Sequence, residues 1–159
     1  MVTTVTLKDT LVDSAKEVFE TMVFMTLAES DPADAGLSGV TLLGSITFKG
    51  DMEGCLGICC EEACARTIAA NRRGLDPDEG IGEEDVSDAM GEIANMVMGA
   101  LKARIQDEVG TIEVSIPSVV QGRELKSNRG EGTCMIKVSV NIEEEFSAEL
   151  SLLFRLHQD

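Results

Sequence analysis

The hydrophobic pattern of this chain changes period several times, and the order of the changes limits the folds that it can adopt. Residues 7–29, 61–72 and 83–107 have the pattern of helices. Apolar residues alternate or run together, as in strands, over residues 40–49, 53–60, 111–120, 133–142 and 147–156. The order helix, two strands, two helices, three strands, with short links between strands, predicts an α+β domain with a largely antiparallel sheet.

Turn and loop residues separate these elements. Gly50-Asp51 is expected to join the first two strands, and three glutamates at 143–145 the last two. Pro32 is expected to end the first helix, because the residue before a proline avoids helical dihedral angles. Gly74 is a C-cap candidate for the second helix. The remaining links are predicted loops at residues 31–39, 75–82 and 122–132.

Length and charge narrow the class of protein further. The 159 residues suit one compact domain, spanning residues 1–159, with a hydrophobic core. The net charge of -16 argues against binding to nucleic acid or to an anionic membrane surface, since both require clustered Lys and Arg. Residues 1–10 do not resemble a secretory signal, and no apolar run reaches the roughly 20 residues of a membrane span. We therefore expect a cytoplasmic protein.

The cysteines permit two interpretations. They are Cys55, Cys59, Cys60, Cys64 and Cys134. Their spacing suggests a metal or redox site, but structural zinc prefers closely spaced pairs, often with histidine, and the only histidine is His157. Residues 54–59 alternate as in a strand, and free cysteine packs well as a small hydrophobe. We expect a core role and no metal site; a metal or redox protein is the alternative.

The longest predicted helix, residues 83–107, carries a narrow polar stripe over an apolar base. At about 100° per residue, five residues fall within roughly 40° of one line. They are Asp88, Glu92, Asn95, Gly99 and Lys102. Five apolar residues fall on the opposite side, namely Val86, Met90, Ile93, Val97 and Leu101. The helix is therefore amphipathic, and an ordinary solvated helix face is one interpretation of the stripe.

Three residues favour a functional surface instead. Asn95 is a poor helix former at a position where Glu or Lys would do better. Gly91 and Gly99 each cost about 1 kcal/mol relative to alanine inside a helix. Because Gly99 lies on the stripe, the backbone beside Asn95 is bare and another surface can approach closely. A carboxylate and a carboxamide one turn apart can bind a cation and orient a water on the same partner.

A weak internal repeat relates the two long helices. Asp13, Glu17 and Glu20 in the first have the spacing of Asp88, Glu92 and Asn95 in the other. The match predicts a pseudo-two-fold repeat, with the two helices side by side on one face of the sheet. The first copy is degenerate, because it has glutamate in place of the asparagine and Phe24 in place of Gly99.

The long helix and the following segment closely resemble the signature of the CheC, CheX and FliY phosphatase family. The matching residues are Asp88-Ala-Met-Gly-Glu92-Ile-Ala-Asn95-Met-Val and the later Ser115-Ile-Pro117-Ser-Val-Val-Gln-Gly122. The order of helices and strands also fits, so the resemblance covers nearly the whole chain and implies a CheC-like fold. CheC-like members carry the motif on both long helices and CheX-like members on one, so this chain is most similar to CheX.

The resemblance implies an enzyme that hydrolyses the aspartyl phosphate of a phosphorylated CheY-like response regulator. Asn95 would align the attacking water, and Glu92 would pair with a lysine of the regulator. The regulator supplies the Mg²⁺, so the chain needs no cofactor of its own. Asp88 would be a peripheral contact, and Lys102 a contact to acidic partner groups, although both are also ordinary surface residues. Pro117 is expected to shape the neighbouring strand. CheX-like proteins are also associated with homodimers.

The rival interpretation is a non-catalytic binding module. Its stripe would sequester a response regulator or dock in the flagellar switch, as related FliM-type domains do. The stripe offers no histidine, cysteine or serine nucleophile, which fits direct hydrolysis better than a covalent intermediate. The presence of both Glu92 and Asn95 favours the enzyme.

Overall fold

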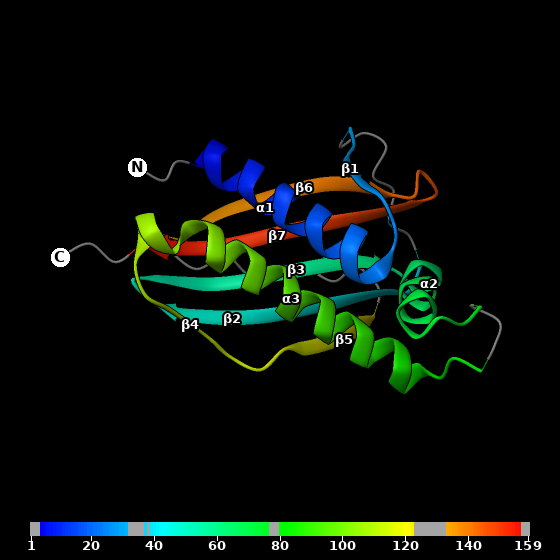
Figure 1. Ribbon diagram of the computed structural model, residues 1–159. Helices are drawn as coiled ribbons and strands as arrows, with labels where there is room; N and C mark the ends of the chain where they lie inside the picture. Colours follow the sequence, from blue (N-terminus) through cyan, green and yellow to red (C-terminus); the bar gives the residue numbers. More distant parts are fainter. Residues whose placement is uncertain (1–3, 32–36, 38, 77–79, 123–132, 157–159) are drawn as a thin grey trace.

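The described residues form a seven-stranded antiparallel sheet that carries helices on one face (Figure 1). The structure is a computed structural model and describes residues 4–31, 37, 39–76, 80–122 and 133–156. The strands are β1 (Leu27–Glu29), β2 (Thr41–Gly50), β3 (Met52–Glu61), β4 (Ile112–Val114), β5 (Ser118–Gly122), β6 (Cys134–Ile142) and β7 (Phe146–Leu156). They lie in the order β1-β6-β7-β3-β2-β4, with β5 also paired to β2. The predicted α+β class and antiparallel sheet are confirmed.

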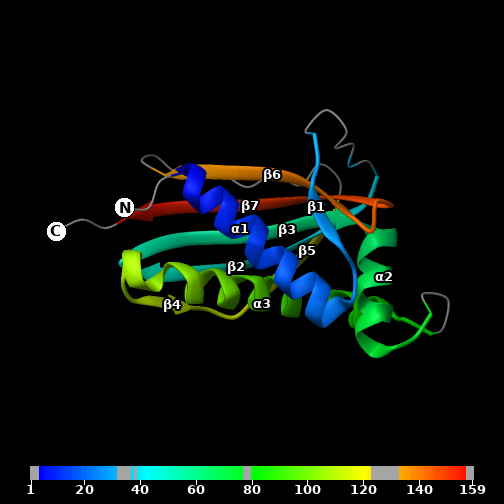
Figure 2. The same ribbon diagram turned by 45° about the horizontal axis from the view of Figure 1, so that its top comes forward.

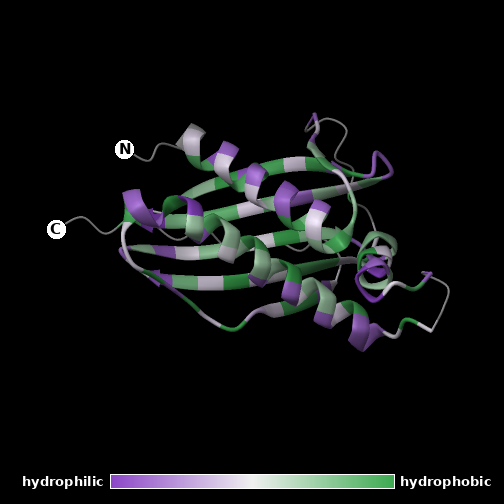
Figure 3. Ribbon diagram, viewed as in Figure 1, coloured by the Kyte–Doolittle hydropathy of each residue, from purple (hydrophilic) through white to green (hydrophobic). Residues whose placement is uncertain are grey.

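Two long hairpins form the centre of the sheet. β2 pairs with β3, and β6 with β7, along almost their whole lengths. Their turns fall at Asp51 and at residues 143–145, where the sequence predicts them. Buried and more exposed residues alternate along β7, because successive side chains of a strand point to opposite faces. Figure 3 shows the strands banded by hydropathy in the same way.

The helices α1 (Thr4–Val18) and α3 (Glu83–Val109) lie side by side on the helix-bearing face of the sheet, as predicted (Figures 1 and 2). An ion pair of 2.7 Å between Arg104 and Glu17 joins them. Gly44 of β2 lets α3 lie close to the sheet, because a Cβ at this position would stand 2.7 Å from the carbonyl oxygen of Met90. The shorter α2 (Glu62–Arg73) lies at one end of the sheet and contacts α3; it ends at Gly74, whose left-handed φ of 70° confirms the predicted C-cap.

The apolar side of α3 supplies much of the hydrophobic core. Its five predicted core residues are all buried, with Met90, Ile93, Val97 and Leu101 at 0% exposure and Val86 at 3%. Leu7, Leu11 and Phe19 cover the sheet from the first helical segment. Burying an aliphatic or aromatic side chain of this size contributes about 1.5–3 kcal/mol, so this packing holds α3 in a fixed orientation.

The prediction of one helix over residues 7–29 is wrong at its C-terminal end. α1 is followed by a π-helical turn, η1 (Phe19–Val23), and by Phe24, whose left-handed φ of 62° ends the helix. Residues 27–29 then form β1, which pairs with β6 at the sheet edge. Strand pairing satisfies the backbone groups of this segment, and apolar periodicity does not reveal such long-range pairing.

The predicted strand over residues 111–120 is two short strands, β4 and β5, which both pair with β2. Residues 115–117 interrupt them. Pro117 has no backbone N–H to donate to a ladder, so a continuous strand is disfavoured there. The N–H of Ser115 donates to the carbonyl oxygen of Thr47 at 3.0 Å, which holds the interruption against β2.

The internal repeat stays a prediction. The strand order places the β2–β3 and β6–β7 hairpins next to each other, an arrangement that such a repeat would require. Most of the three predicted loops, at residues 32–36, 38, 77–79 and 123–132, lies outside the described residues.

Candidate active site

The polar stripe of α3 faces away from the core, as predicted. Asp88, Glu92, Asn95 and Gly99 are exposed, and Lys102 is half-buried. The helix begins where its acidic first turn predicts, because Gly82 precedes it and donates its N–H to the Asp85 carboxylate at 3.1 Å. Packing of the opposite face therefore fixes which side chains the helix presents to solvent.

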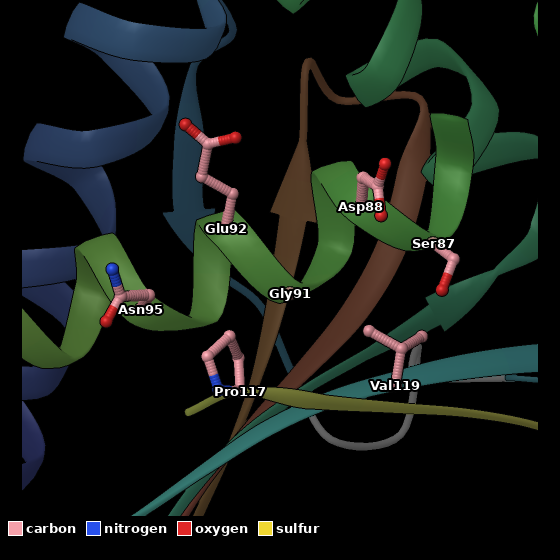
Figure 4. Close-up of a pocket in the computed structure, with 7 residues that line it drawn as sticks. All are labelled: Ser87, Asp88, Gly91, Glu92, Asn95, Pro117 and Val119. Carbon is pink, nitrogen blue, oxygen red and sulfur yellow. The ribbon is translucent and has the colours of Figure 1, made fainter. Parts of the chain in front are cut away.

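A groove of about 360 Å³ runs beside this stripe (Figure 4). It is lined by Ser87, Asp88, Gly91, Glu92 and Asn95 of α3, and by Pro117 and Val119. A Cβ on Gly91 would stand 3.4 Å from Val119 and 3.6 Å from Pro117, so a small residue keeps this side of the groove open. The groove brings together Asp88, Glu92 and Asn95 and does not include Gly99 or Lys102.

Pro117 lies in the interruption between β4 and β5 and also lines the groove. The sequence predicts only its effect on the strand. The strand is interrupted between β4 and β5, and there the ring of Pro117 lies beside Gly91 and faces the same space as Asn95 (Figure 4). Ser87 and Val119 are also lining residues that the sequence does not single out.

The amide of Asn95 is free for a partner. Among the described residues its side chain has no hydrogen-bond partner, and neither does the carboxylate of Asp88. A Cβ on Gly99 would meet no atom within 4 Å, so no neighbouring side chain or backbone crowds the turn after Asn95. The helix thus presents an unoccupied carboxamide beside a bare turn.

Glu92 differs from its neighbours because it has a partner within the chain. Its Oε1 accepts a hydrogen bond from Nη2 of Arg72 at 2.5 Å, so the two residues form an ion pair. Arg72 lies in the last turn of α2, twenty residues earlier. The only sequence signal for it is the basic last turn of that helix, which by itself indicates no contact with the stripe.

The cysteines do not share one environment. Cys60 and Cys64 are buried in the core, as predicted. Cys55 and Cys59 are half-buried and Cys134 is exposed, so the predicted core role is wrong for these three. A hydrogen bond with Cys64, together with burial, raises the pKa of the Cys60 thiol, and burial raises the pKa of Cys55 and Cys59. A raised pKa lowers the thiolate fraction and the reactivity. Within the described part of the chain, no group of three or more His, Cys, Asp or Glu residues is placed to hold a metal ion.

The helix-covered antiparallel sheet and the exposed Glu-x-x-Asn turn beside a proline define a protein of the CheC-like class. A family model described as "Chemotaxis phosphatase CheX" matches residues 42–140, which include every residue of the groove. The chain therefore belongs to the CheX family. A comparison with curated proteins gives no match.

Solved structures support the same assignment. The chain is 26% identical to the chemotaxis protein CheX of Vibrio vulnificus, with a TM-score of 0.78 over 98% of this chain and 100% of that one. It is 27% identical to a CheC-like superfamily protein from Shewanella sp. PV-4, with a TM-score of 0.75 over 98% and 99%.

A third structure is a CheX-CheY-BeF3-Mg²⁺ complex from Borrelia burgdorferi, 18% identical, with a TM-score of 0.74 over 92% of this chain and 96% of that one. At that identity the likeness concerns the fold alone. Separately, none of the helices in the described residues is long and apolar enough to cross a membrane.

Proposed function

We propose that this chain hydrolyses the aspartyl phosphate of a CheY-like response regulator. Membership of a family of chemotaxis phosphatases supports the reaction class. The Borrelia burgdorferi complex, in which a CheX is bound to CheY with BeF3 and Mg²⁺, supports the partner class. The observation that carries the proposal is the exposed pair Glu92 and Asn95 on one turn of α3, beside an open groove.

Asn95 is the residue that orients the attacking water. Its amide can accept a hydrogen bond from a water through oxygen and donate through nitrogen. Because no described residue engages this amide, both ends are available when a partner docks. Phosphoryl transfer requires little covalent chemistry of the protein, so placing one water in line with phosphorus is a sufficient catalytic role.

Glu92 is the docking residue. Its side chain is 52% exposed, and its carboxylate is proposed to pair with a lysine of the regulator. The regulator brings the phosphoryl group and the Mg²⁺, so the chain contributes the amide, the carboxylate and the shape of the groove. Asp88 is proposed as a contact at the rim of the groove, and Gly99 and Lys102 as contacts farther along α3.

The test is the lifetime of the phosphoryl group on purified receiver domains, measured as phosphate release with and without the protein. We expect the wild-type chain to shorten that lifetime and Asn95→Ala to abolish the effect while docking partly survives. Gln106→Ala is the matched control, because it removes another exposed amide from the same helix about three turns after Asn95. We expect this variant to retain full activity. Full activity of Asn95→Ala would contradict the mechanism.

The same assay separates the enzyme from the non-catalytic alternative. A module that only sequesters the regulator binds it and leaves the phosphoryl lifetime unchanged. The predicted homodimer and cytoplasmic location stay predictions, which light scattering of the purified protein and cell fractionation test directly.

A further inference from the structure

Arg72 does not line the groove, but it contacts the groove residue Glu92 and has no part in the roles proposed above. It reaches Glu92 from another helix. Of the four polar groove residues Ser87, Asp88, Glu92 and Asn95, Glu92 is the one whose side chain has a partner in the described structure. The Arg72 side chain is only 20% exposed, whereas the Glu92 side chain is 52% exposed. The arginine is therefore the anchored member of the pair.

The geometry leaves half of the carboxylate free. Arg72 contacts Oε1 through a single nitrogen, so Oε2 has no partner among the described residues. A carboxylate can accept hydrogen bonds on both oxygens at once. One oxygen can thus stay on the arginine while the other accepts from an incoming ammonium group. A free glutamate would have to lose its rotamer freedom on docking, and the arginine has already restricted it.

We propose that Arg72 is a positioning residue, which holds the Glu92 carboxylate so that its second oxygen meets the regulator's lysine. This inference rests on the proposed function. Arg72 acts through Glu92 and does not touch the phosphoryl group. Loss of Arg72 therefore weakens recognition of the phosphorylated regulator and leaves the hydrolytic step on Asn95 unchanged.

The neighbouring arginine supplies a matched control. Arg73 also joins α2 to α3, through an ion pair of 2.8 Å with Asp85. Both pairs hold α2 against the first half of α3, and both acids lie on α3 close to a second hollow of about 290 Å³. Asp85 does not line the groove that contains Asn95. A role that merely ties the helices together is therefore removed equally by changing either arginine.

The experiment measures kcat and KM for phosphate release from a phosphorylated receiver domain. Arg72→Met keeps the aliphatic stem and removes the charge, and Arg73→Met does the same for the control pair. We expect Arg72→Met to raise KM about fivefold, the scale of one half-exposed ion pair and one ordered side chain, with kcat within twofold of wild type. Arg73→Met leaves KM unchanged.

Two further variants make the test independent of stability. Arg72→Lys retains a cation and is expected to restore part of the lost affinity, even if Arg72→Met unfolds at the assay temperature. In a Glu92→Ala background, Arg72→Met is expected to change KM no further, because the residue through which it acts is gone. Thermal unfolding of each variant is followed alongside.

Three results would overturn the inference. They are an unchanged KM in Arg72→Met, a lowered KM, which would mean that the arginine competes with the regulator for Glu92, and an equal rise of KM in the Glu92→Ala background. Failure of the proposed function is distinct, because then wild type and Asn95→Ala would release phosphate at the same rate. If Asn95→Ala is inactive and Arg72→Met behaves like wild type, only the role of Arg72 is lost.

Discussion

The two long helices lie on the same face of the sheet and carry the same spacing of acidic residues, yet only one has the complete motif. α1 presents Asp13 and Glu17 where α3 presents Asp88 and Glu92. All four of these side chains are exposed. The acids therefore do not distinguish the two helices, because an amphipathic helix on any sheet places charged residues on its outer side.

The two glutamates even share an environment. Glu17 pairs with Arg104 at 2.7 Å and Glu92 pairs with Arg72 at 2.5 Å, and each glutamate is 52% exposed. In both cases the arginine comes from a neighbouring helix and is the less exposed partner. Both glutamates therefore join neighbouring helices through an ion pair with arginine. Such an ion pair does not by itself indicate a functional role for the glutamate.

What differs is the turn that follows. α3 continues through Asn95 and Gly99. A Cβ added to Gly99 would meet no atom within 4 Å. At the equivalent place the first helical segment ends in a π turn, and Phe24 stands out at 69% exposure. The comparison indicates that an amide and a bare turn beside a groove make the site, and that the acids alone do not.

The largest effect expected from the comparison is on hydrolysis. Asn95→Glu gives α3 the residue that the first helical segment has at the equivalent position, Glu20 of η1, and we expect the rate enhancement to fall at least about 100-fold, because the water is no longer positioned. Glu20→Ala is the control and should leave the rate within twofold. Phosphate release from a phosphorylated receiver domain measures both; comparable losses in the two variants would remove the distinction between the helices.

The next largest effect is expected from a bulky side chain at position 99. Gly99→Phe copies the side chain of Phe24 onto α3, and we expect about a 30-fold loss of kcat/KM, because the ring obstructs the approach of the regulator. Gly99→Ala is the control: it should raise the free energy of unfolding by about 1 kcal/mol, since alanine is the better helix former, with little loss of activity. Denaturant unfolding and the phosphatase assay separate stability from access. A fully active Gly99→Phe protein would show that this turn faces no partner.

A smaller effect separates the two glutamates. Glu92→Ala is expected to weaken binding and rate together, with a loss of about tenfold in kcat/KM, as for a charge pair at a partly exposed interface. Glu17→Ala removes the corresponding ion pair of α1 and should lower the free energy of unfolding by at most about 1 kcal/mol with no change in activity. If Glu17→Ala impairs hydrolysis as strongly as Glu92→Ala does, both helices contribute to docking.

The last prediction is that restoring the motif on the first helical segment has no effect on phosphatase activity. Glu20→Asn completes the Glu-x-x-Asn pattern that runs from α1 into η1, and in an Asn95→Ala background we expect it to restore no phosphatase activity. Phe24 remains at the place of Gly99, and the helix has already changed to a π turn there. Measurable recovery in the double variant would mean that the motif alone suffices.

Sequence patterns predicted the parts of this fold that depend on local periodicity. The polar stripe of α3, its buried opposite face, the β2–β3 and β6–β7 hairpins and the C-cap at Gly74 all follow from side-chain spacing or from turn residues. The resemblance added the chemical roles of Glu92 and Asn95, which spacing alone does not give. These predictions succeed because a helix with two chemically different sides has one orientation on a core.

The two errors have different causes. The residues after α1 continue a helical pattern, but pairing of β1 with β6 places residues 27–29 at the sheet edge, so hydrogen bonds to a remote strand outweigh a weak local propensity. The strand predicted at 111–120 divides before Pro117, which has no N–H to donate to a ladder, and its two parts pair separately with β2.

The sequence by itself determined that one helix turn would offer an amide and a carboxylate to solvent, because that follows from the angle between residues on a single helix. Only the tertiary structure decided what surrounds that turn. Pro117 lines the groove from the interruption between β4 and β5, and Arg72 contacts Glu92 from the end of another helix. Contacts between residues twenty or more positions apart depend on how elements pack, and helical spacing within α3 carries no information about them.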